Sequence, residues 1–214
     1  QYNNLMFLTA GHLAERVGGA SWEELVRARI LAPLGMQRTN FTVAAMQQDQ
    51  DHGKPYRKDD GKVRAIPFRD ITAIGPAGSI NSSVREMANW AILHLSDGEL
   101  PKSFSGPAAG KRLIKAESLK DLHAPHMTMG EGSGETPEVI PVGYGMGWFL
   151  DVYRGHRRVH HGGNIDGESQ VGIGTTVTIE LPRAGERELR GALGEPREPR
   201  GRGQCILVVD DEDG

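Results

Sequence analysis

Apolar residues at helical spacing dominate the first third of the chain. The first such set recurs at about 3.6 residues: Leu5, Leu8, Leu13 and Val17. It predicts a helix that ends at the glycine pair 18–19. Ser21 and Glu24 have the spacing of a capping box, so a second helix is predicted to begin there and to stop before Pro33. Its inward positions are expected to be Trp22, Leu25, Val26 and Ile30.

The middle of the chain alternates polar loops with one strongly periodic helix. Residues 47–62 are polar and contain the turn signal Asp59-Asp60-Gly61, which indicates a surface excursion. A loop is predicted at 75–78, followed by a helix that Ser82 or Ser83 caps. The apolar face of that helix would be Met87, Trp90, Ala91 and Leu95. A short helix is predicted at 116–123, and residues 130–141 form a Gly/Glu/Pro loop.

After residue 143 the pattern changes from helix to strand. GYGMGWFLDVY and RGHRRVHH predict two strands around a turn at 154–155, and the glycines of the first indicate close backbone approach. Residues 176–181 alternate apolar and polar side chains, which is typical of a half-buried strand. The expected fold class is therefore α+β, with helices packed on an antiparallel sheet that includes residues 143–163.

Composition excludes several classes of protein. A chain of 214 residues with 37% hydrophobic content can form one domain with an appendage. The formal net charge of -3 implies neither nucleic acid nor a membrane surface as partner, and no apolar run approaches the length of a membrane span. The single Cys205 excludes an internal disulfide and a cysteine zinc cluster.

Three common kinds of reactive site are absent from the sequence. His156, His160 and His161 are close together, but neighbouring strand residues point to opposite faces, so we expect no metal. The glycines at 172–174 lack the lysine of a phosphate-binding loop, and no cofactor is expected. No Gly-x-Ser-x-Gly occurs, and no Ser is followed three residues later by Lys.

Several segments, taken in order, resemble the serine β-lactamase and penicillin-binding-protein superfamily, in its class-C-like esterase and peptidase branch. Tyr2-Asn3-Asn4 resembles the Tyr-x-Asn element, and SWEELVRARILAPLGMQRTNF resembles the helix and connection that follow it. GPAGSINSSVREMANW, GYGMGWF and HHGGNIDG resemble three further elements of the family. The resemblance covers residues 1–169, which we take as an incomplete β-lactamase-like domain.

This resemblance implies a serine hydrolase cleft. Tyr2 would be the general base, Asn4 would orient the substrate carbonyl, and His161 would offer a hydrogen bond or a positive charge. The substrate-binding positions would be Gly162, Gly163 and Asn164. Glycine lets an acyl group approach the backbone, whose N–H can stabilise an oxyanion. The implied substrate is a small molecule: a lactam, a D-amino peptide or an ester. Family members are commonly exported, but the sequence leaves localisation open.

The sequence also departs from the family. There a Ser-x-x-Lys pair precedes Tyr-x-Asn, and no such pair occurs in these 214 residues. Without a nucleophile Tyr2 would have no proton to take, so we expect the chain alone to be inactive. The first residue is Gln1, which indicates a fragment or a removed segment, with the N-terminal part of the fold missing.

The tail resembles other proteins. Residues 170–183 resemble the last strand of a histidine kinase ATP-binding domain, 184–204 form a charged linker, and 205–214 resemble the start of a receiver with its acidic pair at Asp210 and Asp211. The alternative function is a non-catalytic ligand-binding or sensory module of a hybrid histidine kinase. The junction is either a chimera or a fusion whose tail strands complete the sheet. Glu168, where the family has an apolar aromatic residue, favours the chimera.

Overall fold

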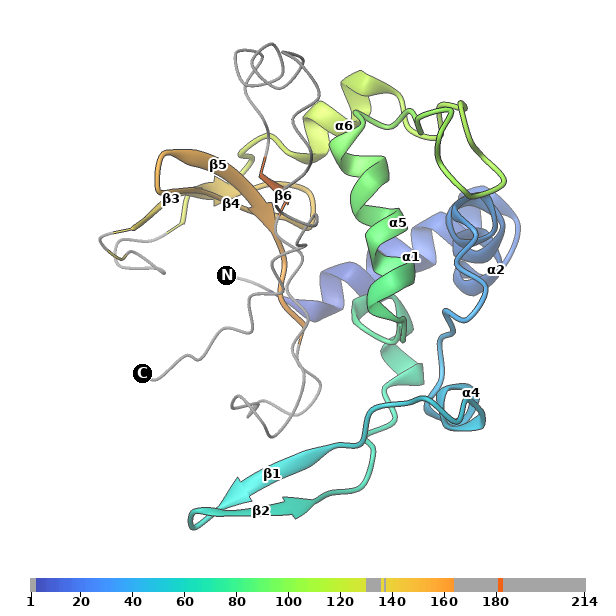
Figure 1. Ribbon diagram of the computed structural model, residues 1–214, viewed down its shortest axis with the longest axis vertical. Coiled ribbons are helices and arrows are strands. Elements are labelled where there is room, and N and C mark those ends of the chain that lie inside the picture. Colours follow the sequence, from blue (N-terminus) through green and yellow to red (C-terminus); the bar gives the residue numbers. More distant parts are fainter. Residues whose placement is uncertain (1–2, 130–135, 137, 164–180, 183–214) are drawn as a thin grey trace, which may run out of the picture.

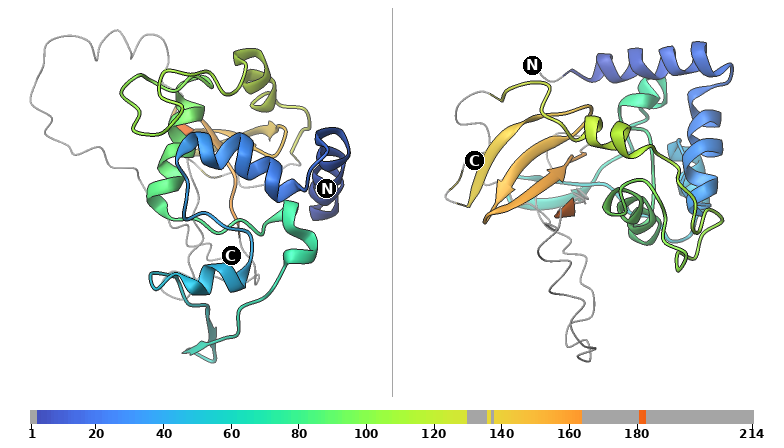
Figure 2. Two further views of the ribbon diagram at one scale, coloured as in Figure 1. Left: turned by 90° about the vertical axis from the view of Figure 1, so that its right-hand side faces the viewer. Right: turned by 90° about the horizontal axis from the view of Figure 1, so that it is seen from above.

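The computed structural model describes residues 3–129, 136, 138–163 and 181–182. Helices gather on one side of the molecule, and a four-stranded antiparallel sheet in the order β3-β4-β5-β6 lies on the other side (Figure 1). A separate two-stranded hairpin extends away from both, as the two further views also show (Figure 2). The α+β prediction is confirmed.

Helix α1 (Asn4–Gly18) begins and ends as the sequence predicts. The Asn3 side chain accepts a hydrogen bond from the Leu5 N–H, and Gly19 closes the helix in the left-handed conformation at φ 71°. The predicted apolar period is not the buried face, because Leu5, Leu13 and Val17 are 60%, 62% and 82% exposed. The helix instead packs against Pro76 through the buried Gly11. The approach is so close that a Cβ added at Gly11 would lie 2.3 Å from the Pro76 ring.

The second helical segment runs further than predicted. Ser21 and Glu24 form the predicted capping box at the start of α2 (Trp22–Val26). The chain then continues through a π-helical turn, η1 (Arg27–Leu31), into α3 (Ala32–Leu34). The predicted stop before Pro33 is therefore wrong. In a helix, proline clashes with the carbonyl four residues back, and the wider π turn relieves that contact. Gly35, at φ 70°, ends the segment.

The predicted surface excursion contains regular structure that the sequence did not reveal. Helix α4 (Val43–Gln48) precedes a hairpin of β1 (Tyr56–Asp59) and β2 (Lys62–Ala65). Asp60 and Gly61 form its turn, both with positive φ, which matches the predicted turn signal. The predicted loop at 75–78 is largely a 3-10 segment, η2 (Thr72–Ala77).

Helix α5 (Val84–Leu95) is the centre of the helical layer, and Ser83 rather than Ser82 caps it. The predicted Leu95 contact is wrong, because that side chain is 54% exposed, whereas Leu93 is buried. The main core is a single cluster of buried side chains: Leu31, Leu34, Met36, Phe41, Leu93, Leu100, Phe104 and Ala108. Buried Glu86 accepts hydrogen bonds from the Arg38 N–H and the Thr39 hydroxyl, which joins α5 to the connection after α3.

The sheet is built from β3 (Val139–Tyr144), β4 (Phe149–Tyr153), β5 (His156–His160) and β6 (Leu181–Pro182). The predicted turn at 154–155 joins β4 to β5. The segment GYGMGWFLDVY, predicted as one strand, is divided between two strands. Its first two residues, 143–144, belong to β3, and residues 149–153 form β4. Helix α6 (Ala116–Leu122) confirms the helix predicted at 116–123, and the Met146 N–H donates to the Leu122 carbonyl at its end. A Cβ at Gly145 would lie 2.4 Å from the Leu122 carbonyl oxygen, so glycine is required there.

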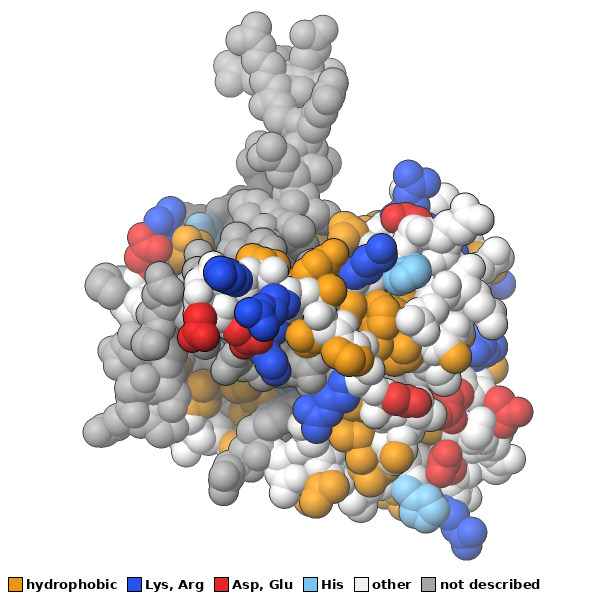
Figure 3. Space-filling model, turned by 90° about the horizontal axis from the view of Figure 1, so that it is seen from below, with side chains coloured by type: hydrophobic (Ala, Val, Ile, Leu, Met, Phe, Trp, Pro, Cys, Tyr) orange, Lys and Arg blue, Asp and Glu red, His pale blue; other side chains and the backbone are white. Residues whose placement is uncertain are grey.

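Some sequence predictions lie outside the described residues. They include Tyr2, Asn164, most of the strand at 176–181, the linker at 184–204 and the receiver-like segment at 205–214. In the described part of the chain, no helix is long and apolar enough to cross a membrane. The face in Figure 3 carries basic, acidic and apolar side chains intermixed, in keeping with the nearly balanced charge.

Candidate active site

The end of β5 and the first turns of α1 meet at His161. This residue follows the last residue of β5, and its ring centroid lies 6.4 Å from that of Phe7 in α1. Phe7 also faces the loop between β3 and β4, since a Cβ at Gly147 would lie 3.5 Å from its ring. The tertiary structure thus brings together two segments that are about 150 residues apart in the sequence, the start of α1 and the end of β5.

Asn4 belongs to the same end of α1. It is the first residue of the helix, and it lies one turn before Phe7 on the same face, since residues three apart are neighbours on a helix. Its side chain is exposed. Asn4 therefore lies at the same end of α1 as Phe7, while Tyr2 lies outside the described residues.

Three aromatic rings surround the His161 imidazole. The Phe149 centroid lies 5.3 Å from it, and the Tyr144 centroid lies 6.3 Å from it in an edge arrangement. Phe7 completes the set from α1. None of these rings was singled out from the sequence, although the GYGMGWF segment that supplies two of them was. Phe149 could have been found by pairing the two predicted strands around their turn, because it lies directly opposite His160 in the β4–β5 pair.

The His161 imidazole has a polar neighbour in its own chain. Nδ1 lies within hydrogen-bond distance of the Gly162 carbonyl oxygen. A carbonyl oxygen only accepts, so a proton on Nδ1 would be donated to it in this contact. The other ring nitrogen, Nε2, is buried. Gly162 and Gly163 follow with exposed backbone.

The histidine beside it has a different environment. His160 Nε2 lies 2.9 Å from Asp151 Oδ2, and Arg158 forms two hydrogen bonds with the same carboxylate. In the described residues no three His, Cys, Asp or Glu side chains are grouped as metal ligands would be. His160 therefore belongs to a buried ion pair on the sheet.

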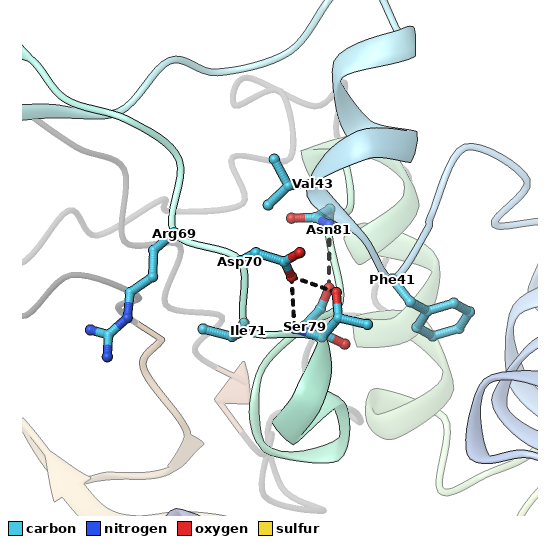
Figure 4. Close-up of a pocket in the computed structure, with 8 residues that line it drawn as sticks. Phe41, Val43, Arg69, Asp70, Ile71, Ser79 and Asn81 are labelled. Atoms are coloured by element: carbon cyan, nitrogen blue, oxygen red, sulfur yellow. Dashed lines mark hydrogen bonds between the residues drawn. The ribbon is translucent and has the colours of Figure 1, made fainter.

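Two cavities lie away from this site. The smaller, of about 10 Å³, is lined by Arg69, Asp70 and Asn81 with neighbouring residues (Figure 4). Its volume is enough for about one water molecule. The larger, of about 360 Å³, lies between α1 and η2 and includes His12 and Trp22. Neither is lined by a residue of the His161 site in the described part of the chain.

Comparison with known proteins settles the family. The beta-lactamase family profile matches residues 1–185. The chain belongs to the beta-lactamase family. This match extends past residue 169, where we placed the end of the domain, and no comparison supports the kinase and receiver resemblance of the tail.

Individual relatives agree with this assignment. The chain is 28% identical over 188 residues to unguisins hydrolase ungD' of Aspergillus campestris, which covers 86% of this chain and 31% of that protein. Among solved structures, it is similar to the octameric penicillin-binding protein homologue from Pyrococcus abyssi, at 25% identity and TM-score 0.65, covering 85% of this chain and 35% of the other. A D-stereospecific amidohydrolase from Streptomyces sp. shares the fold at 23% identity and TM-score 0.60, covering 86% and 46%. The chain spans about a third of the length of the curated relatives that it matches.

Proposed function

We propose that this chain supplies the general-base and substrate-binding side of a beta-lactamase-family acyl-transfer site. Tyr2 would accept the proton of a nucleophile, Asn4 would orient the substrate carbonyl, and His161 would hydrogen-bond the substrate. The residues after His161, Gly162, Gly163 and Asn164, would line the acyl group. The observation that carries the proposal is the contact between Phe7 of α1 and His161, which unites the two motifs.

The chemistry of these groups suits amide and ester substrates. A phenol has a reference pKa of about 10, so Tyr2 would need a neighbouring cation in order to act as a base near neutral pH. A backbone N–H after His161 could donate to a developing oxyanion, a contact worth several kcal/mol in such sites. The substrate class is a lactam, a D-amino peptide or an ester. The name of the Aspergillus campestris relative, a hydrolase, is consistent with that class.

The chain alone is expected to bind substrate without turning it over. Its 214 residues contain no Ser-x-x-Lys pair, so no recognised serine is present to form an acyl-enzyme. We expect no hydrolysis of nitrocefin or p-nitrophenyl acetate above background. Mass spectrometry after incubation with benzylpenicillin should show no covalent adduct, and saturable turnover would refute the expected inactivity.

Binding tests the site itself. Benzylpenicillin and D-phenylalaninamide, titrated into the full chain and followed by NMR, should perturb the signals of His161 and Gly162. His161→Gln should weaken this binding, because it removes the imidazole. His12→Gln is the matched control, since the His12 side chain is 69% exposed and takes no part in the ring cluster around His161. Equal binding by both variants, or no binding by the wild type, would contradict the assignment of the site.

A further inference from the structure

We propose that Asp151 and His160 are positioning residues for His161, acting through the ring of Phe149. The four side chains form a continuous series of contacts along β4 and the end of β5. The functional part of this inference rests on the proposed role of His161 in substrate binding. The structural part, that Asp151 determines the orientation of the His161 ring, stands on the contacts alone.

The series starts at a buried carboxylate. Asp151 is 5% exposed, and it lies directly opposite Arg158 in the β4–β5 pair. Arg158 Nε donates to Oδ1 at 2.8 Å and its Nη2 donates to Oδ2 at 2.7 Å, so both carboxylate oxygens are engaged. This bidentate pair fixes the plane of the carboxylate.

The second link is the hydrogen bond to His160. Its Nε2 lies 2.9 Å from Asp151 Oδ2. An ionised carboxylate can only accept, so the proton lies on Nε2 of the imidazole. Asp151 thereby selects both the tautomer and the rotation of the His160 ring. Residues two apart on a strand share a face, which is why Asp151 and Phe149 on β4 meet Arg158 and His160 on β5.

The third link is aromatic. The Phe149 ring stacks on His160 with centroids 5.6 Å apart and an interplanar angle of 28°. It also contacts His161, at 5.3 Å and 36°. Phe149 thus contacts both histidines, and a rotation of the His160 ring would disturb the ring that His161 also contacts. Tyr144 contacts Phe149 as well, edge-on at 4.8 Å.

Stability alone is a weak explanation for this arrangement. A buried ion pair often adds little compared with apolar side chains of similar volume, because both charges must leave water. Removing one partner, in contrast, leaves an uncompensated charge. Variants must therefore keep the fold while they change the tautomer or the stacking, and the readout must follow His161 directly.

The experiment uses the full chain and histidine side-chain ¹H–¹⁵N correlation spectra, which distinguish the two imidazole tautomers. In the wild type we expect the Nε2–H form of His160. In Asp151→Asn, Arg158 loses one of its two acceptors, and the amide can present either its oxygen or its NH₂ group to His160. The His160 ring should then no longer be held in one tautomer and orientation, and the His161 signals should shift. Asp59→Asn is the matched control, because the exposed Arg57–Asp59 pair at 3.0 Å lies in the separate β1–β2 hairpin, which extends away from the sheet (Figure 1). It should leave His160 and His161 unchanged.

Two substitutions at His160 test the hydrogen bond to Asp151 and the stacking on Phe149 separately. They also test the inference if Asp151→Asn does not fold. His160→Phe keeps the stacking on Phe149 without the hydrogen bond, and His160→Gln keeps an amide donor without the ring. Both should move the His161 signals. Each should also weaken benzylpenicillin binding roughly fivefold, the size expected of a coupling between neighbouring side chains. Unchanged His161 signals in both variants would overturn the inference. Wild-type protein that binds no probe, with His161 signals that still shift in the variants, would instead reject the proposed function and leave the positioning role supported.

Discussion

At the scale of single residues, one strongly perturbed group is a histidine that the sequence did not single out. His94, on α5, is 5% exposed and lies against Trp90, His123 and Trp148, with ring centroids 4.3, 5.2 and 4.9 Å away. Burial, and secondly the neighbouring His123, lowers the pKa of His94 to about 3. These rings join α5, the end of α6 and the loop before β4.

This environment predicts a loss of stability in acid. Above about pH 6.5 His94 is neutral whether the chain is folded or unfolded, so the group contributes no pH dependence there. As the pH falls from 6.5 toward 3, the unfolded chain takes up a proton that the folded chain does not. The free energy of unfolding should therefore fall by about 1.4 kcal/mol per pH unit from this group.

Urea unfolding at pH 7 and pH 5 checks this prediction. His94→Phe keeps the ring packing without a titrating nitrogen, so it should reduce the loss between these pH values by about 2 kcal/mol. His12→Gln is the control, because the His12 side chain is 69% exposed. An equal loss in wild type and His94→Phe would show that other groups carry the acid sensitivity.

The residues of the candidate site could be predicted only in part. Asn4 and His161 were predicted through motif resemblance, and their roles stay predictions; the structure adds the contact of Phe7 with His161. Asp151 and Phe149 were missed, because a carboxylate and a ring within a strand have no local signature. Their importance depends on the register of β4 against β5, which brings Asp151 opposite Arg158.

At the scale of elements, local signals predicted helix ends better than buried faces. The Ser21–Glu24 capping box and the Gly19 termination are short-range features, and both are confirmed. The exposed side of α1 was missed because periodicity shows that a helix is amphipathic without showing what packs on it. Hairpin β1–β2 was missed because its charged residues obscure the alternation typical of strands.

Glycine in the segment before β4 gives a sharp test of close packing. A Cβ at Gly145 would lie 2.4 Å from the Leu122 carbonyl oxygen and 2.9 Å from that of Ala124, and backbone atoms cannot move aside as a side chain can. Gly145→Ala should therefore destabilise the protein by roughly 1–3 kcal/mol. Gly53→Ala is the matched control, because nothing lies within 4 Å of its added Cβ, and it should change stability by less than about 0.5 kcal/mol. Thermal unfolding of both variants measures this difference. Equal unfolding midpoints for Gly145→Ala and Gly53→Ala would contradict the packing argument.

At the scale of the whole molecule, the tail bears on where the domain ends. Leu181 and Pro182 pair with Val159 and Arg158 on the outer edge of β5, and the family match continues to residue 185. Both observations favour a structural role for this short segment over a chimeric addition, and we propose that the sheet requires it. The proposal replaces residue 169 with about residue 185 as the domain boundary.

Truncation tests this boundary. A chain that ends after residue 185 should keep the melting temperature of the full chain. A chain that ends after residue 169 should melt lower, by about 2–4 °C for each kcal/mol lost, because it leaves the edge of β5 and Val159 uncovered. Identical melting of the two truncated chains would support the chimera instead.

The sequence by itself determined the helix caps, the glycine-dependent turns, the α+β class and the family, because these depend on a few neighbouring residues or on ordered motifs. The tertiary structure decided which face of each helix is buried, that α1 meets the end of β5, and that His160 lies within hydrogen-bond distance of Asp151. Those outcomes depend on contacts between segments distant in the chain, whose geometry is fixed by packing and strand register and leaves no trace in local sequence.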